Sequence, residues 1–250
     1  MKPLIVANWK NHPASWGDAK KLFDATKKAF EKTKNLSLII APPAVYLREL
    51  SKSRSKRLSF AAQGVVADEV VAHTGETTLS QVKDARATYV LVGHAERRER
   101  GESNDDTAQI IPEAFLKNIT PILCVGERTR QDDGEHFHFI REQLRVGFSN
   151  VLAGKIGKVI VAYEPVWAIG GTAAMKPRDM HEMAIFIRKS IYDLHGKVGL
   201  TQTVLYGGSI DEKSAGQMLG LGDVQGLLIG RASTNAEQFT ALISSLANIK

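Results

Sequence analysis

"VIVAYEPVWAIGG" (residues 159–171) joins a run of apolar residues to a carboxylate, a proline, a tryptophan and a pair of glycines. The run has no alternating polar residues, which is typical of a strand covered on both faces. Glu164 follows it directly. The carboxyl ends of parallel strands meet at one edge of a sheet, where ligands bind. Apolar neighbours disfavour ionisation of such a carboxylate and make it a stronger base. A single glutamate at a strand end is more often an ion-pair partner, so its meaning depends on the rest of the chain.

Runs of the same kind recur along the chain, with helix-length segments between most of them. With residues 159–164 they number eight, and the others are residues 4–8, 36–42, 58–63, 89–94, 121–127, 203–209 and 226–233. Strands that alternate with helices, without a break in composition, predict one α/β domain over residues 1–250 with eight parallel strands. Periodicity does not decide between a closed barrel and an open sheet. No G-x-G-x-x-G pattern follows the first run, which counts against an open dinucleotide-binding sheet.

Several helical segments carry signals of their own. Two of them have an apolar face, formed by Ala19, Leu22, Phe23, Thr26 and Phe30 in one and by Phe137, Ile140, Leu144, Phe148 and Val151 in the other. "TNAE" (234–237) predicts a capping box at the start of the last helix, and His195-Gly196 predicts a helix end. Pro112 interrupts the helical pattern of residues 105–118, which predicts either a kink or a helix that restarts with Pro112 in its first turn.

The composition is that of an ordinary globular protein and limits the expected partners. Of the 250 residues, 43% are hydrophobic and 24% are charged, and the longest apolar runs are strand-sized, so we expect no membrane partner. The N-terminal "MKPLIVANWK" turns polar too soon for a signal peptide, and the single Cys124 excludes an internal disulfide framework. Both favour the cytoplasm. The net charge of +6 suits an anionic substrate, whereas no basic block interleaved with aromatics supports nucleic-acid binding.

The expected strands end in polar or glycine-rich residues. These are Asn8 and Lys10, Gln63, His94 and Glu96, Glu127, Glu164, Gly207 to Ser209, and Gly230 with Arg231. His94 begins a polar segment that could start a helix, where the helix dipole disfavours the positive form of a histidine. Such a neutral ring can donate a hydrogen bond as an acid. A lone histidine after a strand is more often structural.

Glycines after the last two expected strands predict an anion site. "YGGSI" (206–210) and "IGRAS" (229–233) each allow backbone N–H groups to approach an anion closely, and a helix follows each of them. One glycine turn is weak evidence. Two of them on the last two strands match the phosphate site common in barrels. No histidine pair has a metal-ligand spacing, so we expect no metal.

With these residues assembled, the chain resembles the triosephosphate isomerase family over essentially its whole length. The matching motifs, in order, are "ANWK" (7–10), "TGE" (74–76), "VGHAERR" (92–98), "GES" (101–103), "PILCVGE" (121–127), "AYEPVWAIG" (162–170), "YGGS" (206–209) and "IGRAS" (229–233). The resemblance implies a single-domain (β/α)8 barrel. It also implies the interconversion of dihydroxyacetone phosphate and D-glyceraldehyde 3-phosphate, a step of glycolysis and gluconeogenesis.

The resemblance assigns roles to individual residues. It makes Glu164 the base, neutral His94 the acid that polarises the carbonyl, and Lys10 the stabilising charge. The substrate-binding residues are Asn8, Lys10, Gly170, Ser209, Gly230 and Arg231, with the phosphate on the backbone N–H groups of the last four. The supporting residues are Glu96 as a buried carboxylate, Glu127 holding Trp167 in the open state, and Tyr206 with Ser209 as the latch of a closed lid (residues 165–175). No cofactor is implied, because proton transfer and electrostatics suffice.

The resemblance also implies contacts outside the active site. It implies a homodimer in which residues 73–78 enter a pocket beside the partner's active site. Thr74 then approaches the partner's Asn8, and Glu76 pairs with the partner's Arg97. Within one chain, Arg188 is expected to pair with Asp223.

Some positions depart from the family pattern. Ala95 replaces a serine whose hydroxyl holds the catalytic carboxylate when the lid is open. We therefore expect Glu164 to be disordered, swung inward, or held by a water or another donor. Asn11 stands where an apolar interface residue is usual, "GTAAM" (171–175) alters the end of the lid, and the segment between Arg98 and Gly101 is one residue short. Arg231 replaces a glycine, but only its backbone N–H is needed.

Two other functions remain compatible with parts of this pattern. Another barrel enzyme that acts on a phosphorylated sugar or an indole precursor would share the phosphate loops, but not Lys10, His94 and Glu164 together. A catalytically idle relative could serve as a scaffold or bind nucleic acid, which the net charge and the altered lid would suit.

Overall fold

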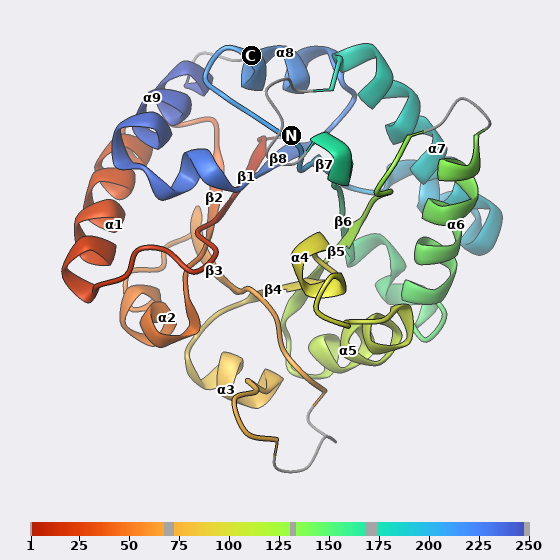
Figure 1. The fold of residues 1–250 in the computed structure, drawn as a ribbon, viewed down its shortest axis with the longest axis horizontal. Coiled ribbons are helices and arrows are strands. Elements are labelled where there is room, and N and C mark those ends of the chain that lie inside the picture. The colour runs from red at the N-terminus through yellow and green to blue at the C-terminus, as the bar shows by residue number, and fades with distance from the viewer. Residues whose placement is uncertain (1, 68–72, 131–133, 169–174, 248–250) are drawn as a thin grey trace.

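The computed structural model describes residues 2–67, 73–130, 134–168 and 175–247, and it shows a closed barrel of eight parallel strands (Figure 1). The strands follow one another in chain order, and β8 pairs with β1 to close the sheet. They are β1 (Leu4–Asn8), β2 (Ser37–Ala41), β3 (Leu58–Ala62), β4 (Tyr89–Val92), β5 (Thr120–Val125), β6 (Ile160–Tyr163), β7 (Val204–Tyr206) and β8 (Gly226–Ile229). The eight expected strands are thus confirmed, and the sheet is closed.

The strands lack polar alternation because both of their faces are buried. One set of side chains fills the inside of the barrel: Val6, Ile39, Ala41, Ala61, Leu91, Ile122, Cys124, Ile160, Ala162, Leu205 and Leu228. The alternate residues of each strand point outward and pack with the apolar faces of the helices in a second, larger cluster. The side chains inside the barrel and those packed between the strands and the helices together hold the strand ends in place.

Most of the helices cover the outside of the barrel, whereas the short α4 (Ala95–Arg98) lies at its end beside β4 and β5 (Figure 1). The other helices are α1 (Trp16–Glu31), α2 (Ala44–Ser51), α3 (Leu79–Asp84), α5 (Asn104–Leu116), α6 (Glu135–Gly147), α7 (Pro177–His195), α8 (Ser214–Leu221) and α9 (Ala236–Leu246). Short 3-10 segments are η1 (Ala153–Lys158), η2 (Val166–Ala168), η3 (Gly196–Thr201) and η4 (Arg231–Thr234).

The apolar faces predicted for two helices are confirmed in one and confirmed in part in the other. All five residues predicted for α1 are buried. In α6 the helix ends at Gly147, so Phe148 and Val151 are buried beyond its end rather than on its face. Phe137 is only partly buried, and its ring lies against Phe186 of α7 at a centroid distance of 4.6 Å.

Two helix-end predictions have different outcomes. Gly196 follows α7 with a φ of 74°, which confirms the predicted helix end. The predicted capping box at Thr234 is wrong, because Thr234 is the last residue of η4. Asn235 takes the capping position instead, and its side chain accepts a hydrogen bond from Gln238 N at 3.0 Å.

Pro112 lies inside α5, so of the two alternatives expected there, a kink or a restarted helix, the restart is wrong. α5 begins at Asn104 after a capping box between Ser103 and Asp106. In a regular helix the amide of residue 112 would bond to the Ala108 carbonyl, but proline has no N–H. Asn150 Nδ2 donates to this carbonyl at 3.2 Å. A side chain from beyond α6 thereby replaces the missing bond.

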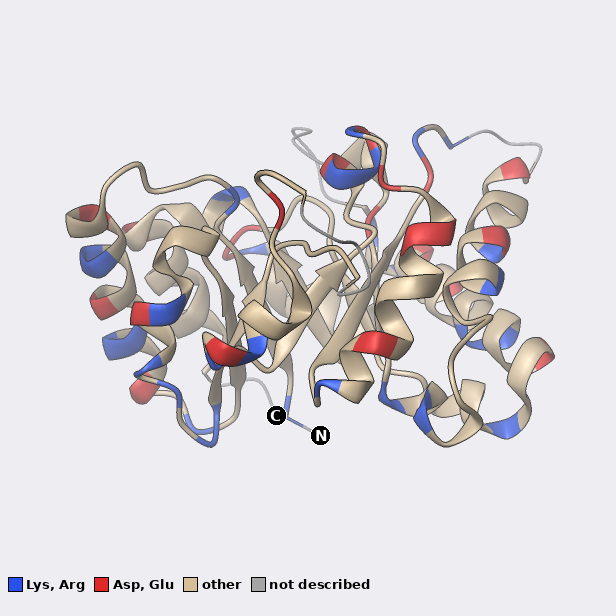
Figure 2. Ribbon diagram, turned by 90° about the horizontal axis from the view of Figure 1, so that it is seen from below, with Lys and Arg blue, Asp and Glu red and all other residues tan. Residues whose placement is uncertain are grey.

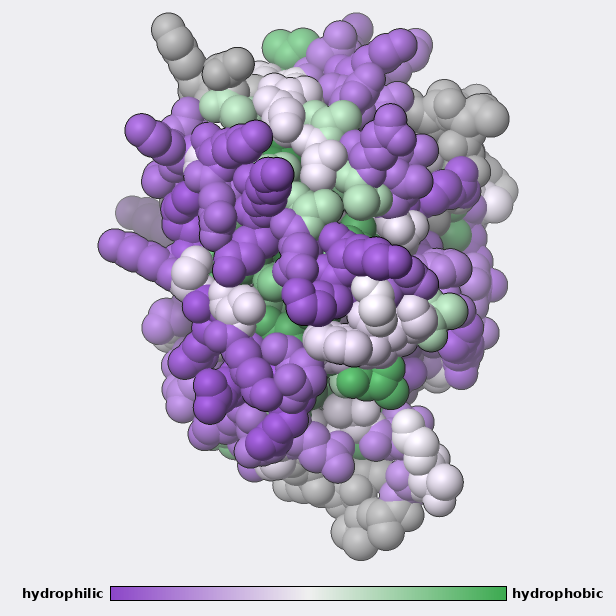
Figure 3. Space-filling model, turned by 90° about the vertical axis from the view of Figure 1, so that its left-hand side faces the viewer, coloured by the Kyte–Doolittle hydropathy of each residue, from purple (hydrophilic) through white to green (hydrophobic). Residues whose placement is uncertain are grey.

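The outer surface is polar and carries charges of both signs. Lys and Arg alternate with Asp and Glu over the helices on the side seen in Figure 2. The side that carries α1 is mostly hydrophilic, with small apolar areas between the charged side chains (Figure 3). Among the residues that the structure describes, no helix is long and apolar enough to cross a membrane.

Candidate active site

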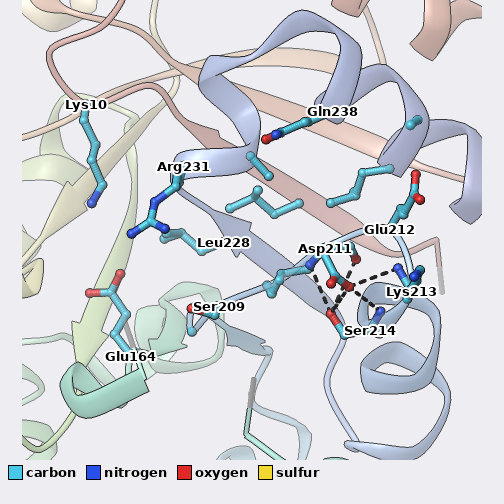
Figure 4. Close-up of a pocket in the computed structure, with 18 of the residues that line it drawn as sticks. Lys10, Glu164, Ser209, Asp211, Glu212, Lys213, Ser214, Leu228, Arg231 and Gln238 are labelled. Atoms are coloured by element: carbon cyan, nitrogen blue, oxygen red, sulfur yellow. Dashed lines mark hydrogen bonds between the residues drawn. The ribbon is translucent and has the colours of Figure 1, made fainter. Parts of the chain in front are cut away.

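The polar residues that follow the strands gather around a cavity of about 940 Å³ at one end of the barrel. Figure 4 shows Lys10, Glu164, Ser209 and Arg231 facing this space from the ends of four different strands. The predicted site residues that line the cavity are Lys10, His94, Glu96, Glu164, Ser209, Gly230 and Arg231. Predicted residue Gly170 lies outside the described residues.

Glu164 follows β6, and its side chain is only 2% exposed. Its Oε2 accepts a hydrogen bond from the backbone N–H of Ala95 at 3.3 Å, and its Oε1 lies 3.2 Å from His94 Nε2. A β-carbon on Gly207 would come within 2.8 Å of Glu164 Cγ. The glycine after β7 therefore makes the space that the carboxylate occupies.

His94 ends the loop after β4 and is buried at the start of α4. Two donors face its ring: Glu96 N lies 3.2 Å from Nδ1, and Asn8 Nδ2 lies 3.2 Å from Nε2. A neutral imidazole has one acceptor nitrogen and satisfies one of these donors, whereas an imidazolium has none.

Lys10 is held at the end of β1 in an unusual backbone conformation. Its φ is 52°, which is uncommon for a residue other than glycine. Its N–H donates to Asn8 Oδ1 at 3.0 Å, and Gln63 Nε2 donates to its carbonyl at 2.6 Å. These two contacts fix the backbone from which the ammonium group enters the cavity.

Glu96 pairs with the Lys10 ammonium, but it is not the buried carboxylate that the resemblance implied. Its side chain is 46% exposed, because α4 turns it toward the opening of the cavity beside Lys10. Partial burial acts to raise the pKa of Glu96, but the hydrogen bond and the charge of Lys10 hold it below its ordinary value.

Contacts at both ends of the expected lid are present together. At the first end, Trp167 Nε1 donates to Glu127 Oε1 at 2.8 Å, and the Tyr163 hydroxyl contacts both oxygens of this buried carboxylate. At the other end, Met175 N donates to the Tyr206 hydroxyl at 3.0 Å. Burial raises the pKa of Tyr206 to about 12, so its hydroxyl stays neutral at ordinary pH.

Ser209 provides a further contact with the lid's first end. Its hydroxyl donates to the Ala168 carbonyl at 2.7 Å. The Glu127–Trp167 contact was expected in the open state, whereas Tyr206 and Ser209 were expected to act in the closed state. The structure holds all three contacts at once, and residues 169–174 between them lie outside the described part of the chain.

Side-chain patterns missed three features of the site. The donor that holds Glu164 is the backbone of Ala95, which no side-chain motif reveals. The thiol of Cys124 contacts Glu164 from inside the barrel, and its pKa is raised first by burial and then by that carboxylate. The side chain of Arg231 lies in the cavity, although only its backbone was expected to matter.

The structure shows the partners, within one chain, of two arginines that were predicted to form ion pairs. Arg188 Nη1 lies 2.5 Å from Asp223 Oδ2, which confirms this pair. Arg97 Nε lies 2.8 Å from Glu102 Oε2 of the same chain. The predicted pairing of Glu76 with the partner's Arg97 stays a prediction.

Comparison with known proteins agrees with the geometry of the site. The family model of triosephosphate isomerase matches residues 3–246. A triosephosphate isomerase of Rhodococcus jostii is 37% identical, with 96% of this chain and 95% of that protein aligned. Triosephosphate isomerases of Coxiella burnetii, at 34% identity over 95% of this chain and 94% of theirs, and of Endomicrobium trichonymphae, at 31% over 97% and 98%, are also similar. The chain belongs to the triosephosphate isomerase family.

Proposed function

We propose that this chain, an isomerase by its family, interconverts dihydroxyacetone phosphate and D-glyceraldehyde 3-phosphate. The observation that carries the proposal is the juxtaposition of Glu164 and His94. The two side chains are buried and lie 3.2 Å apart at the cavity, and Lys10 lines the same cavity. A base, a neutral acid and a fixed cation at one place suit proton transfer next to a carbonyl.

In this mechanism Glu164 removes a proton from C1 of dihydroxyacetone phosphate. The C–H electron pair forms the C1–C2 double bond of the enediolate, and the carbonyl electrons move to O2. His94 donates a proton to this oxygen and takes one from the hydroxyl on C1, while Lys10 stabilises the negative charge. Return of the proton from Glu164 to C2 gives glyceraldehyde 3-phosphate. The proton is transferred inside the site, and no oxidant or reductant is consumed.

The phosphate group rests on backbone N–H groups of Gly170, Ser209, Gly230 and Arg231 in this proposal. The glycine turns after β7 and β8 support it, because they border the cavity next to Lys10 and Glu164. Residues 165–175 act as a lid that excludes water and protects the enediolate. Asn8 contributes by its contact with the His94 ring.

We further propose that the chain acts as a homodimer in the cytoplasm, with residues 73–78 inserted beside the partner's active site. Thr74 and Glu76 are exposed in the single chain and available for such contacts.

A coupled assay tests the proposed reaction most simply. Glyceraldehyde 3-phosphate is supplied to the purified chain, and the dihydroxyacetone phosphate formed is reduced by a dehydrogenase with NADH. We expect turnover well above that of buffer. No turnover with either triose phosphate would contradict the proposal and favour another barrel enzyme or an idle relative.

A further inference from the structure

The guanidinium group of Arg231 extends into the cavity near both the reacting groups and Ser209. Arg231 is the first residue of η4, directly after the glycine turn that follows β8. Figure 4 shows its side chain extending from η4 into the space between Lys10 and Glu164, with Ser209 across from it. The other lysine that lines the cavity, Lys213, lies on the far side of the same space. Arg231 thus faces both the reacting groups and Ser209, one of the residues proposed to hold the phosphate, whereas Lys213 does not.

The backbone beneath Arg231 is firmly held. The Ser233 hydroxyl is fully buried and lies within hydrogen-bond distance of three carbonyl oxygens, those of Gly230 (2.7 Å), Ile229 (2.9 Å) and Asn8 (3.1 Å). These contacts tie η4 to the ends of both β8 and β1. A fixed backbone limits the motion of the Arg231 side chain to its own rotamers.

With a substrate bound, this end of the cavity would hold several negatively charged groups. The Lys10 ammonium is already paired with the Glu96 carboxylate, and Glu164 adds a further acidic group. A triose phosphate brings a dianionic phosphate into the same space. A guanidinium presents a planar fork of donors that matches two phosphate oxygens and keeps its charge at all ordinary pH values.

We propose that the Arg231 side chain binds the substrate's phosphate group directly, as a ligand additional to the backbone N–H groups of the glycine turns. The inference rests on the proposed function for the identity of the substrate, but inorganic phosphate shares the chemistry that the side chain recognises. Arg231 then sets the affinity for the phosphorylated substrate, whereas Glu164, His94 and Lys10 carry out the reaction.

A contact to the phosphate is made alike in the bound substrate and in the transition state. Uniform binding of this kind lowers KM and leaves kcat nearly unchanged. We therefore expect Arg231→Gln to raise KM for glyceraldehyde 3-phosphate at least tenfold, while kcat changes less than threefold. Arg231→Lys retains a cation and should recover most of the loss.

Titration calorimetry with inorganic phosphate, at constant ionic strength, tests the inference without relying on turnover. The variants are Arg231→Gln, Arg231→Lys and the matched control Lys213→Gln, which removes one positive charge from the same cavity. We expect the dissociation constant to rise at least tenfold in Arg231→Gln and less than twofold in Lys213→Gln. Thermal unfolding of each variant verifies that the fold is retained, as the exposed position of Arg231 leads us to expect.

Three results would overturn the inference: a dissociation constant in Arg231→Gln within twofold of the wild type, an equal loss in Lys213→Gln, or no phosphate binding by the wild type. Either of the first two results would mean that Arg231 affects phosphate binding at most through the overall charge of the cavity. A wild type that isomerises triose phosphates, with phosphate binding independent of Arg231, refutes this inference alone. A wild type that binds phosphate through Arg231 but isomerises neither triose phosphate refutes the proposed function alone.

Discussion

The backbone N–H of Ala95 donates a hydrogen bond to Glu164 Oε2 at 3.3 Å. The resemblance implied a serine hydroxyl at this position, so Glu164 was expected to be disordered, swung inward, or held by a water or another donor. The third outcome is the one found, and the donor belongs to Ala95 itself. The other oxygen, Oε1, has no aligned hydrogen-bond donor among the described residues, although it is buried. The carboxylate therefore has an aligned hydrogen bond at Oε2 only, while Oε1 lies 3.2 Å from His94 Nε2.

Ala95→Ser should add a second donor for Glu164 in its resting position. Ala95 and Glu164 both border a second cavity of about 490 Å³, so the hydroxyl has space. A hydrogen bond to a charged group contributes about 1.5–3 kcal/mol. We expect turnover to change by less than about a hundredfold, since the base and the acid are both retained. Steady-state kinetics measures this, and a larger loss would show that the loosely held carboxylate is required.

Gly207→Ala should displace the base without unfolding the protein. The added β-carbon would lie 2.8 Å from Glu164 Cγ, which is closer than two carbons approach, so the glutamate must move. A misplacement of about 1 Å can reduce turnover about a hundredfold. Gly220→Ala in α8 is the matched control, because nothing lies within 4 Å of its β-carbon. Equal turnover in the two variants would show that Gly207 does not position Glu164.

Asn150→Ala should destabilise the protein more when Pro112 is present than when it is replaced. Loss of one hydrogen bond to a carbonyl costs about 0.5–1.5 kcal/mol in the free energy of unfolding. In a Pro112→Ala background the new amide bonds to the Ala108 carbonyl, so the loss of Asn150 should cost less. Urea unfolding of the two single variants and the double variant gives this coupling. Costs that do not depend on residue 112 would mean that Asn150 does not compensate for the proline.

The proposed dimer should dissociate more readily than is typical of its family. Asn11 is exposed in the single chain, and burial in an interface without a hydrogen-bond partner would cost about 1–3 kcal/mol. Sedimentation at micromolar and nanomolar concentrations should show a dimer at the first and monomers at the second. Asn11→Leu should shift the equilibrium toward the dimer. A monomer at both concentrations contradicts the dimer itself, and a wild-type dimer at both contradicts its weakening.

The strands were predictable because a strand that is buried on both faces has a continuous run of apolar residues in the sequence. The runs around Val161 and Leu228 contain no polar alternation, and both side-chain sets are buried as expected. Closure of the sheet depends on the pairing of β8 with β1, which a local pattern does not encode. The helix cap was misplaced for a related reason: Thr234 and Asn235 are both good caps, and the preceding η4 decides between them.

The identity of the site residues was predictable, but their directions were not. Lys10, His94 and Glu164 each follow a strand, so the fold alone brings them to one cavity. The exposure of Glu96 depends on the orientation of α4, and the position of the Arg231 guanidinium depends on the anchoring of η4. Neither is a property of the residue type. The sequence predicts which groups meet, and packing decides how they face one another.

The most direct test of the central claim is the turnover of Glu164→Gln with glyceraldehyde 3-phosphate. A carboxamide has nearly the same shape and can still accept the Ala95 N–H bond, so the thermal unfolding curve should match that of the wild type. It cannot accept a proton from carbon, and we expect turnover to fall by several orders of magnitude. One decade of rate corresponds to about 1.4 kcal/mol of barrier. A folded variant that retains more than about a tenth of the wild-type turnover would contradict the account, because Glu164 would then not be the base.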